Sequence, residues 1–427
     1  MPGTSTATPA IHTVVLQPTP FCNINCRYCY LPDRSATTVM ALETVLASMR
    51  RIFESGWASS QLTVIWHAGE PLVLPVSYYK AAFEAIEAIR PPWLELRHSI
   101  QTNGMLLTKE WCDFLKQWEV GIGVSVDGPL HIHDANRVTR SGAGTFERTI
   151  AGVRMLHREG VPFHVISVLS QAGMQSPEEM LDFYLAEGIE NVCFNVEESE
   201  GDHVSTLLTG GDASASFRSF LERFWALARQ SSGVHFIREI DSMIPRIFRS
   251  EGADDMGNAQ VEPFGMVNID CHGNVSSFSP ELLGLKNVTY NDFIIGNVLT
   301  ESLAEMSRSA AMVKMTRDIA AGVAACASQC EYFSVCGGGS PVNKLSENGS
   351  FASTRTGFCT LVQMVPTDLI LNALDRLEGR LDGEMTRVTA GAPDFVKASA
   401  APDRRGAQGF VDLREIATHQ IQRGTPT

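Results

Sequence analysis

Cysteine is the residue type whose spacing carries most chemistry in this chain. Ten cysteines are present; three crowd into residues 22–29 and three into residues 326–336, while the other four lie farther apart. Thiolates at such short spacings bind metal ions or iron–sulfur clusters. Because a reducing cytosol disfavours disulfides, this clustering predicts a metal or catalytic role.

The first cluster comprises Cys22, Cys26 and Cys29 and comes directly after a predicted strand. In α/β barrels the chemistry lies at the carboxyl ends of the strands. Three thiolates can hold three irons of a cubane cluster and leave the fourth iron open, whereas a ferredoxin-type cluster is closed by four. The alternative is a structural zinc site that takes its fourth ligand from elsewhere in the chain.

Strand-like runs alternate with helix-period stretches in the first 200 residues. The strands are predicted at residues 12–19, 61–66, 96–102, 121–126, 162–169 and 191–196. The helices are predicted at residues 41–54, 78–89, 109–118, 146–158 and 177–187. This alternation favours parallel βα units. We therefore predict an α/β fold, a partial (β/α)6 barrel of the TIM type, because six strands are visible rather than eight.

The second half of the chain has a different pattern. Helices are predicted at residues 213–230, 238–249, 303–319 and 366–381, and a hairpin at residues 264–270 and 275–278. The tail after about Thr386 is predicted to be partly mobile. The predicted parts are an N-terminal extension (1–11), the barrel (12–205), a helical bridge (206–260), a cysteine-rich extension (261–365) and a C-terminal helix with the tail (366–427).

Charge and hydropathy exclude several classes of protein. The formal net charge is −14 and no block of Lys and Arg stands out, so we expect no nucleic-acid partner. The first ten residues lack the basic and apolar regions of a signal peptide, and no apolar run is long enough to span a membrane. We therefore expect a cytoplasmic protein with no membrane partner.

The first cluster and four further motifs resemble the radical S-adenosylmethionine (SAM) enzymes. An aromatic residue stands before the third cysteine, residues 67–71 resemble the family's Gly-Gly-Glu-Pro motif, and residues 101–104, 125–129 and 133–137 follow in order. The resemblance implies that Cys22, Cys26 and Cys29 hold a SAM-binding [4Fe–4S] cluster. It implies that SAM is contacted by Tyr28, Gly69, Glu70, Pro71, Asn103, Ser125, Asp127 and Arg137. One-electron cleavage of SAM would then give a 5′-deoxyadenosyl radical.

Each of these residues also has a plainer interpretation when taken alone. Glu70 suits a charge at a helix N-terminus, Asp127 suits a turn and Arg137 suits a surface cation. The family's two glycines are replaced by His67 and Ala68. We do not expect this replacement to alter the contact of Glu70 with SAM.

The second cluster resembles the SPASM extension of radical SAM peptide-modifying enzymes. Its run Cys-x3-Cys-x5-Cys has one residue more in the first gap than the family's run. The resemblance implies that one auxiliary [4Fe–4S] cluster is held by Cys326, Cys330, Cys336 and Cys359. Ser340 and Phe278 stand where ligands of a second auxiliary cluster belong, so we expect only one. The remaining cysteines, expected to be buried thiols, are Cys112, Cys193 and Cys271.

Four segments resemble the cyclophane-forming radical SAM/SPASM maturases, and this similarity extends to about residue 375. The segments are residues 16–26, 66–71, 278–282 and 336–344. The resemblance implies an oxidoreductase that joins an aromatic ring carbon to the β-carbon of a residue two positions on, which closes a three-residue cyclophane. The implied partners are a ribosomal precursor peptide and an external one-electron donor of the flavodoxin or ferredoxin type.

Glu281 is our candidate for the base that removes the ring proton after the crosslink forms. It follows the predicted hairpin, where relatives place the second auxiliary cluster; a solvated glutamate or a helix-start charge is the plainer interpretation. Sulfatase-maturase-like oxidation of Ser or Cys, epimerisation and thioether formation are the alternative activities. An iron–sulfur electron carrier is the alternative outside the enzymes.

Overall fold

The structure, a computed structural model, describes residues 9–199, 203–205, 212–249 and 258–388. Predictions for three parts of the chain lie partly or wholly outside these ranges: the N-terminal extension (1–11), the helical bridge (206–260) and the tail after Thr386. The boundaries of the five predicted parts stay predictions.

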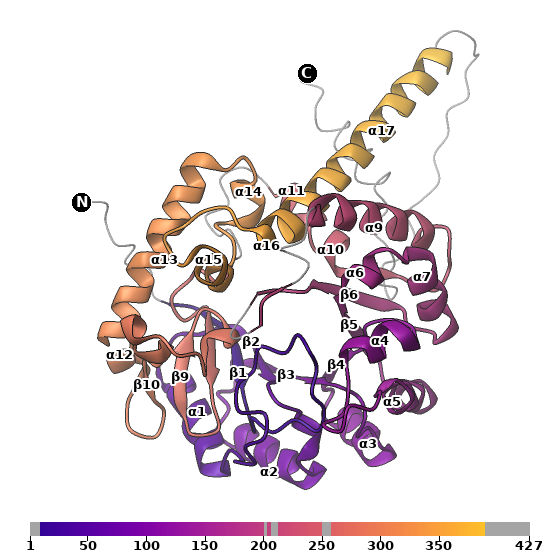
Figure 1. The fold of residues 1–427 in the computed structure, drawn as a ribbon. Helices are drawn as coiled ribbons and strands as arrows, with labels where there is room; N and C mark the ends of the chain where they lie inside the picture. The colour runs from indigo at the N-terminus through magenta and orange to yellow at the C-terminus, as the bar shows by residue number, and fades with distance from the viewer. Residues whose placement is uncertain (1–8, 200–202, 206–211, 250–257, 389–427) are drawn as a thin grey trace.

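Six parallel strands in sequence order form the centre of the fold (Figure 1). They are β1 (Ile11–Leu16), β2 (Ala58–Trp66), β3 (Glu95–Thr102), β4 (Gly121–Ser125), β5 (His164–Leu169) and β6 (Asn191–Val196). Strand β1 shifts register against β2 between Ile11 and Thr13, and beyond that point Val15 pairs with Ile65 and Ile65 with Ser99. The α/β fold with a parallel sheet is therefore confirmed.

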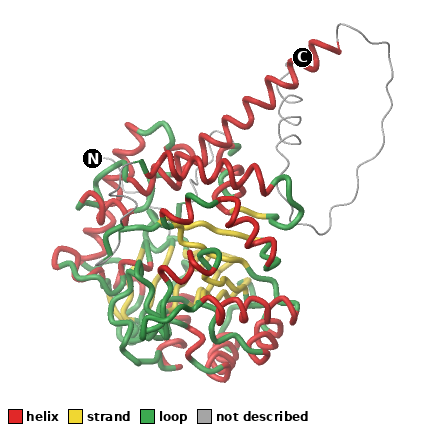
Figure 2. The backbone as a smooth tube through the Cα atoms, turned by 45° about the vertical axis from the view of Figure 1, so that its right-hand side comes forward, coloured by secondary structure: helices red, strands yellow, loops and turns green. Residues whose placement is uncertain are grey.

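Helices follow each strand and cover the outer face of this sheet (Figures 1 and 2). The predicted ones are α1 (Leu42–Glu54), α2 (Val76–Glu87), α3 (Lys109–Gln117), α5 (Phe146–Glu159) and α7 (Pro177–Ala186). Trp66 of β2 packs against Tyr79 and Phe83 of α2. Since side chains alternate along a strand, Ile65 and His67 face the opposite, inner side of the sheet.

Several short elements were not expected from the sequence. They are α4 (Leu130–Asn136), α6 (Gln171–Met174), β7 (Phe236–Ile237), β10 (Gly296–Asn297) and three 3-10 helices, η1 (Pro71–Val73), η2 (Pro280–Leu282) and η3 (Val288–Phe293). Each has at most seven residues, which is too few to give a periodic pattern of apolar residues.

The predicted hairpin is confirmed, and it continues the barrel sheet. It consists of β8 (Met266–Ile269) and β9 (Asn274–Ser277), which pair antiparallel. Strand β8 also pairs in parallel with β1, with Asn268 opposite Val15. The complete strand order is β10-β9-β8-β1-β2-β3-β4-β5-β6-β7. The second half of the chain therefore extends the sheet next to its first strand.

Helices of the second half join the two edges of this open sheet. They are α9 (Ala213–Ala228), α12 (Leu303–Met306), α13 (Ala310–Gln329), α14 (Phe333–Cys336), α15 (Pro341–Asn348), α16 (Gly357–Cys359), the π-helical turn η4 (Thr360–Met364) and α17 (Val365–Val388). Helix α17 contacts α9 and then extends away from the rest of the fold (Figures 1 and 2). It is longer than the predicted helix at residues 366–381.

Two predicted helices are interrupted, so these predictions are wrong in detail. The helix expected at residues 238–249 is two short ones, α10 (Arg238–Asp241) and α11 (Ile244–Ile247). Pro245 lacks an N–H donor and stands in the first turn of α11, where a new helix begins. The helix expected at residues 303–319 is α12 followed by α13, because the Ser309 hydroxyl caps a new helix by accepting from the N–H of Met312 (3.2 Å).

One segment, Gly357–Arg376, is long and apolar enough to cross a membrane by length and composition alone. Core helices pass the same test, so a single such segment is weak evidence. Here Leu361, Val365 and Ile370 are buried, and the segment contacts α9. The cytoplasmic location stays a prediction.

Candidate functional site

Two loops that follow neighbouring strands meet at the first cysteine cluster. The N–H of Glu70 donates to the carbonyl of Phe21 (2.8 Å), and Gly69 has a left-handed φ of 61°. A Cβ atom at residue 69 would overlap the carbonyl oxygens of Thr19 and Phe21. Glycine is therefore required at position 69, because it lets the motif at residues 67–71 lie against the loop that carries the cysteines.

Glu70 is buried, and its carboxylate accepts three hydrogen bonds. The donors are the N–H of Leu72 (2.9 Å), the hydroxyl of Thr102 (2.6 Å) and the N–H of Asn103 (2.7 Å). Burial raises the pKa of Glu70, and these bonds oppose the shift. The plainer interpretation is correct in part, since Glu70 caps η1. A carboxylate has about four acceptor positions, so one remains for the predicted contact with SAM.

Tyr28, Asp127 and Arg137, three predicted SAM contacts, lie together beside Cys26. The Tyr28 hydroxyl donates to Asp127 (2.5 Å), and the Arg137 guanidinium pairs with the same carboxylate (3.0 Å). Arg137 also approaches Cys26 Sγ at 3.9 Å. Arg137 is buried, so the interpretation as a surface cation is wrong. The group can hold a positive charge next to a cysteine ligand.

The other predicted contacts lie at or just after the ends of β2, β3 and β4. The Asn103 amide donates to the side chain of Asn23 in the cysteine loop (2.7 Å), and the Pro71 carbonyl accepts from the Tyr79 hydroxyl (2.9 Å). The Ser125 hydroxyl accepts from the Gln101 amide (3.0 Å). The structure therefore brings the sequence-predicted residues to one end of the strands, while their contacts with SAM stay predictions.

The thiols of the first cluster are suited to an iron–sulfur cluster. Burial raises the pKa of Cys22 to about 12 and that of Cys26 to about 11, and the Arg137 charge opposes the second shift. Bound cations favour the thiolate form and so offset the cost that burial places on its charge. In the described part of the chain, no three Cys, His, Asp or Glu side chains converge on a single-ion position. A four-iron cluster takes its thiolates at separate corners, and so needs no such convergence.

Polar residues inside the barrel were missed by sequence reasoning. A Cβ atom at Gly123 would meet both Gln101 and the His164 ring, so these two side chains meet over the glycine. The Arg238 guanidinium donates to the Asn195 side chain and to the carbonyl of Phe194, both at 2.8 Å. Polar residues at alternate positions of a predicted barrel strand are the signal that could have revealed them.

Glu281 lies on η2, beside the first cysteine loop. The Gln17 amide, at the end of β1, donates to the carbonyl of Pro280 (3.4 Å). A Cβ atom at Gly284 would lie 3.1 Å from Pro32 of the cysteine loop. Burial raises the pKa of Glu281, and a hydrogen bond from the Ser279 hydroxyl opposes the shift. The side chain is partly buried, which does not fit a freely solvated glutamate.

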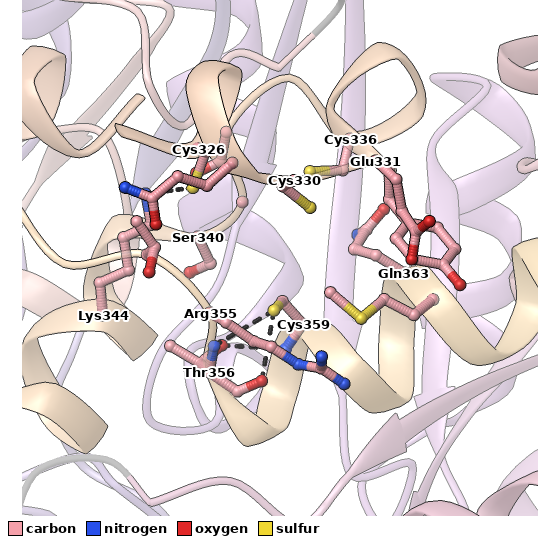
Figure 3. Close-up of a pocket in the computed structure, with 16 residues that line it drawn as sticks. Cys326, Cys330, Glu331, Cys336, Ser340, Lys344, Arg355, Thr356, Cys359 and Gln363 are labelled. Carbon is pink, nitrogen blue, oxygen red and sulfur yellow. Dashed lines mark hydrogen bonds between the residues drawn. The ribbon is translucent and has the colours of Figure 1, made fainter. Parts of the chain in front are cut away.

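The cysteines of the second cluster line one cavity of about 470 Å³. Cys326 lies in the last turn of α13, Cys330 at its C-terminal cap, Cys336 in α14 and Cys359 in α16. Figure 3 shows Cys326, Cys330 and Cys336 along one side and Cys359 opposite them. Four thiols that line one cavity are the donor set of a [4Fe–4S] cluster.

Phe278 and Ser340 stand where relatives have ligands of a second auxiliary cluster, and neither residue is a cysteine. Phe278 is fully buried, and Ser340 precedes the first residue of α15 and lines the four-cysteine cavity. Cys112, Cys193 and Cys271 are buried thiols, as predicted.

Comparison with known proteins gives a consistent result. Residues 16–184 match the model of the Radical SAM superfamily. An uncharacterized protein from Synechocystis is 37% identical over 86% of this chain and 92% of its own length. A serine-type anaerobic sulfatase-maturating enzyme from Bacteroides thetaiotaomicron is 25% identical over 76% of this chain and 81% of its own.

Solved structures share the fold. The anSMEcpe structure with bound AdoMet and Cp18Cys peptide has a TM-score of 0.68 at 18% identity, and covers 87% of this chain and 99% of that one. Streptococcus suis SuiB bound to precursor peptide SuiA has a TM-score of 0.55 at 14% identity, and covers 82% of this chain and 76% of that one.

The barrel, the cysteine loop after β1 and these matches define an enzyme that acts through SAM and iron–sulfur chemistry. The chain belongs to the radical SAM superfamily. Its cofactors are accordingly SAM and [4Fe–4S] clusters. The prediction of an enzyme is confirmed over the electron-carrier alternative.

Proposed function

We propose that this enzyme forms a C–C crosslink in a ribosomally made precursor peptide, between an aromatic ring carbon and a side-chain β-carbon. The observation that carries the proposal is the four-cysteine cavity, with Phe278 and Ser340 in place of ligands to a second auxiliary cluster. Phe278 and Ser340 lie in two of the segments that resemble the cyclophane-forming maturases, residues 278–282 and 336–344. A peptide substrate is supported by the relatives, since the SuiB and anSMEcpe structures carry bound peptides.

The reaction removes two hydrogens from the peptide and adds no atoms. When bound, the first cluster and SAM would supply the radical chemistry that removes one β-hydrogen atom from the peptide. The peptide's β-carbon then bonds to the ring carbon, and the ring regains aromaticity by losing one proton and one electron. An external one-electron donor of the flavodoxin or ferredoxin type starts each turnover.

Residues of this chain are proposed to position the reactants and to move the proton. Cys22, Cys26 and Cys29 hold the first cluster, while Glu70 and Asn103 orient SAM against it. Glu281 receives the ring proton on its carboxylate, from a loop that adjoins the first cysteine loop. Its raised pKa makes it a stronger base than an ordinary glutamate.

Cys326, Cys330, Cys336 and Cys359 would hold the auxiliary cluster, which would supply an acceptor for the electron that the ring loses. Its four cysteines are supplied by α13, α14 and α16 and the loop between the first two. The Asn343 amide of α15, in the same region, donates to Glu198 just after β6 (2.7 Å). This contact ties the auxiliary region to the barrel.

A sulfatase-maturase-like oxidation of Ser or Cys is the second candidate. It is favoured by the similarity to sulfatase-maturating enzymes over most of the chain. This reaction on Ser also removes two hydrogens, so the mass of the product alone does not separate the two candidates.

The experiment is anaerobic turnover of the reconstituted enzyme with synthetic peptides in which an aromatic residue stands two positions before the residue to be crosslinked. We expect a loss of two mass units per crosslink, no fragmentation between the joined residues, and a substituted aromatic ring by NMR. An aldehyde trapped by a hydrazine reagent, together with an unsubstituted ring, would establish the second candidate instead.

A further inference from the structure

Lys344 of α15 places a buried ammonium group against a cysteine of the auxiliary cavity. Its Nζ lies 3.3 Å from Cys326 Sγ (Figure 3), and only 3% of the residue is exposed. Among the described residues, no carboxylate lies within ion-pair distance of this Nζ. The Cys326 sulfur is thus the hydrogen-bond partner of this ammonium group.

Space for the ammonium group depends on a glycine of α13. A Cβ atom at Gly322 would lie 3.2 Å from Lys344 Nζ and would overlap the carbonyl oxygen of Phe351. The helix therefore comes close enough for the lysine to reach Cys326, one helical turn further along α13. The contact is built by two elements, and is not a chance approach of a surface side chain.

A buried cation without a carboxylate partner is unfavourable unless another negative charge compensates it. Four thiolates that bind a [4Fe–4S] cluster provide that charge. The reduced cluster carries one more negative charge than the oxidised cluster. A cation at fixed distance therefore stabilises the reduced form more, which raises the reduction potential.

We infer that Lys344 is a positioning residue that raises the reduction potential of the auxiliary cluster through Cys326 and so makes it a better electron acceptor. The inference rests on the proposed assignment of the four cysteines to one cluster. It does not depend on which peptide modification the enzyme carries out.

The test is a redox titration of the auxiliary cluster, followed by EPR. Full-length protein with Cys22, Cys26 and Cys29 changed to Ala isolates this cluster, and iron content confirms loading. Lys344→Met removes the charge at similar length, and Lys344→Arg keeps it. Lys314→Met is the matched control, because Lys314 lies on α13, the helix of Cys326, but is paired with Asp318 (2.8 Å). Lys314 precedes Cys326 by about 18 Å of helix.

With Lys344→Met, we expect the ratio of oxidised to reduced cluster at a fixed potential to rise about tenfold, equivalent to about 59 mV for one electron. Lys344→Arg and Lys314→Met should stay near the parent value. If Lys344→Met does not load iron, Lys344→Gln also lacks the charge and gives the same comparison.

Equal potentials in the parent and in the loaded Met or Gln variant would overturn the role of Lys344 and leave the cluster assignment intact. If the protein with Cys22, Cys26 and Cys29 changed to Ala and Lys344 unchanged binds no iron, the assignment of the four cysteines to one cluster is wrong. The inference about Lys344 then fails with it. The two failures are therefore distinguishable.

Discussion

At the residue scale, the carboxyl group of Glu281 is held between two opposing influences. Burial raises its pKa, whereas the hydrogen bond from Ser279 lowers it. A general base works in its deprotonated form, so its rate is lost as pH falls through its pKa. Because the pKa is raised, the acidic limb of the pH profile should lie above that of an ordinary glutamate.

Glu281→Gln keeps the size of the side chain and removes its basicity. We expect crosslink formation to slow roughly 10²–10⁴-fold, with 5′-deoxyadenosine still formed, as measured by chromatography of both products. Ser279→Ala should move the acidic limb to still higher pH, because the bond that favours the carboxylate is lost. Unchanged turnover in Glu281→Gln would assign the proton transfer to another group.

Single cysteine substitutions test the two clusters separately. Changing Cys22, Cys26 or Cys29 to Ala should abolish SAM cleavage, since each supplies one of three ligands to the first cluster. Cys336→Ala should retain part of the SAM cleavage and lose the crosslinked product. Cys112→Ala, on α3 in the hydrophobic core, is the control and should keep both activities. Full crosslinking by the cluster variants would contradict the mechanism.

Motif spacing allowed the cysteines and the SAM-contact candidates to be predicted, because these residues lie close in sequence or at strand ends. The environment of each side chain was harder to predict. Nothing in the sequence indicates that Arg137 is buried against Asp127 and Tyr28, since those partners come from other loops. His164, on β5, was missed for the same reason, because its neighbour Gln101 lies two strands away on β3.

At the element scale, the motif at residues 67–71 can contact the cysteine loop only because Gly69 has no side chain. Gly69→Ala would force overlap with Thr19 and Phe21, which costs roughly 1–3 kcal/mol, in addition to about 1 kcal/mol for the left-handed backbone. Denaturant unfolding of the apoprotein should show this loss.

Gly56→Ala is the matched control for Gly69→Ala. Gly56 has a similar φ of 71°, but nothing lies within 4 Å of a Cβ atom there. It should lose only about 1 kcal/mol, from the backbone alone. Equal losses in the two variants would show that the loop contact does not constrain residue 69.

Element types were predicted well where apolar periodicity was long, as in α1, α5 and the six central strands. Prediction failed where a local group interrupts a periodic stretch. Ser309 begins α13 and Pro245 restarts a helix within a segment that otherwise reads as continuous. Periodicity reports which face is buried, and that face continues across such a break.

At the scale of the whole molecule, two separate sites should each hold four irons. Anaerobically reconstituted protein should therefore bind about eight irons per chain, as measured by a colorimetric iron assay with EPR of the reduced protein. About twelve irons would mean that Phe278 and Ser340 do not replace the ligands of another cluster. About four would leave the second cavity for a different metal.

The pairing of β8 with β1 could not be predicted from the sequence. A hairpin is a local feature, and its turn at residues 272–274 is visible in the sequence. Which sheet the hairpin joins depends on contacts between distant segments. More than half of the chain lies between Leu16 and its partner Ile269.

This separation has a consequence for how the protein is made. Strand β1 is synthesised early, yet one of its edges waits for β8, and an unpaired edge invites pairing with other chains. Long-range strand pairs also form slowly. A chain that ends at residue 262 should therefore enter the pellet on ultracentrifugation, while the full chain stays in the supernatant. A soluble, monomeric fragment would show that the barrel matures before the ribosome has delivered β8.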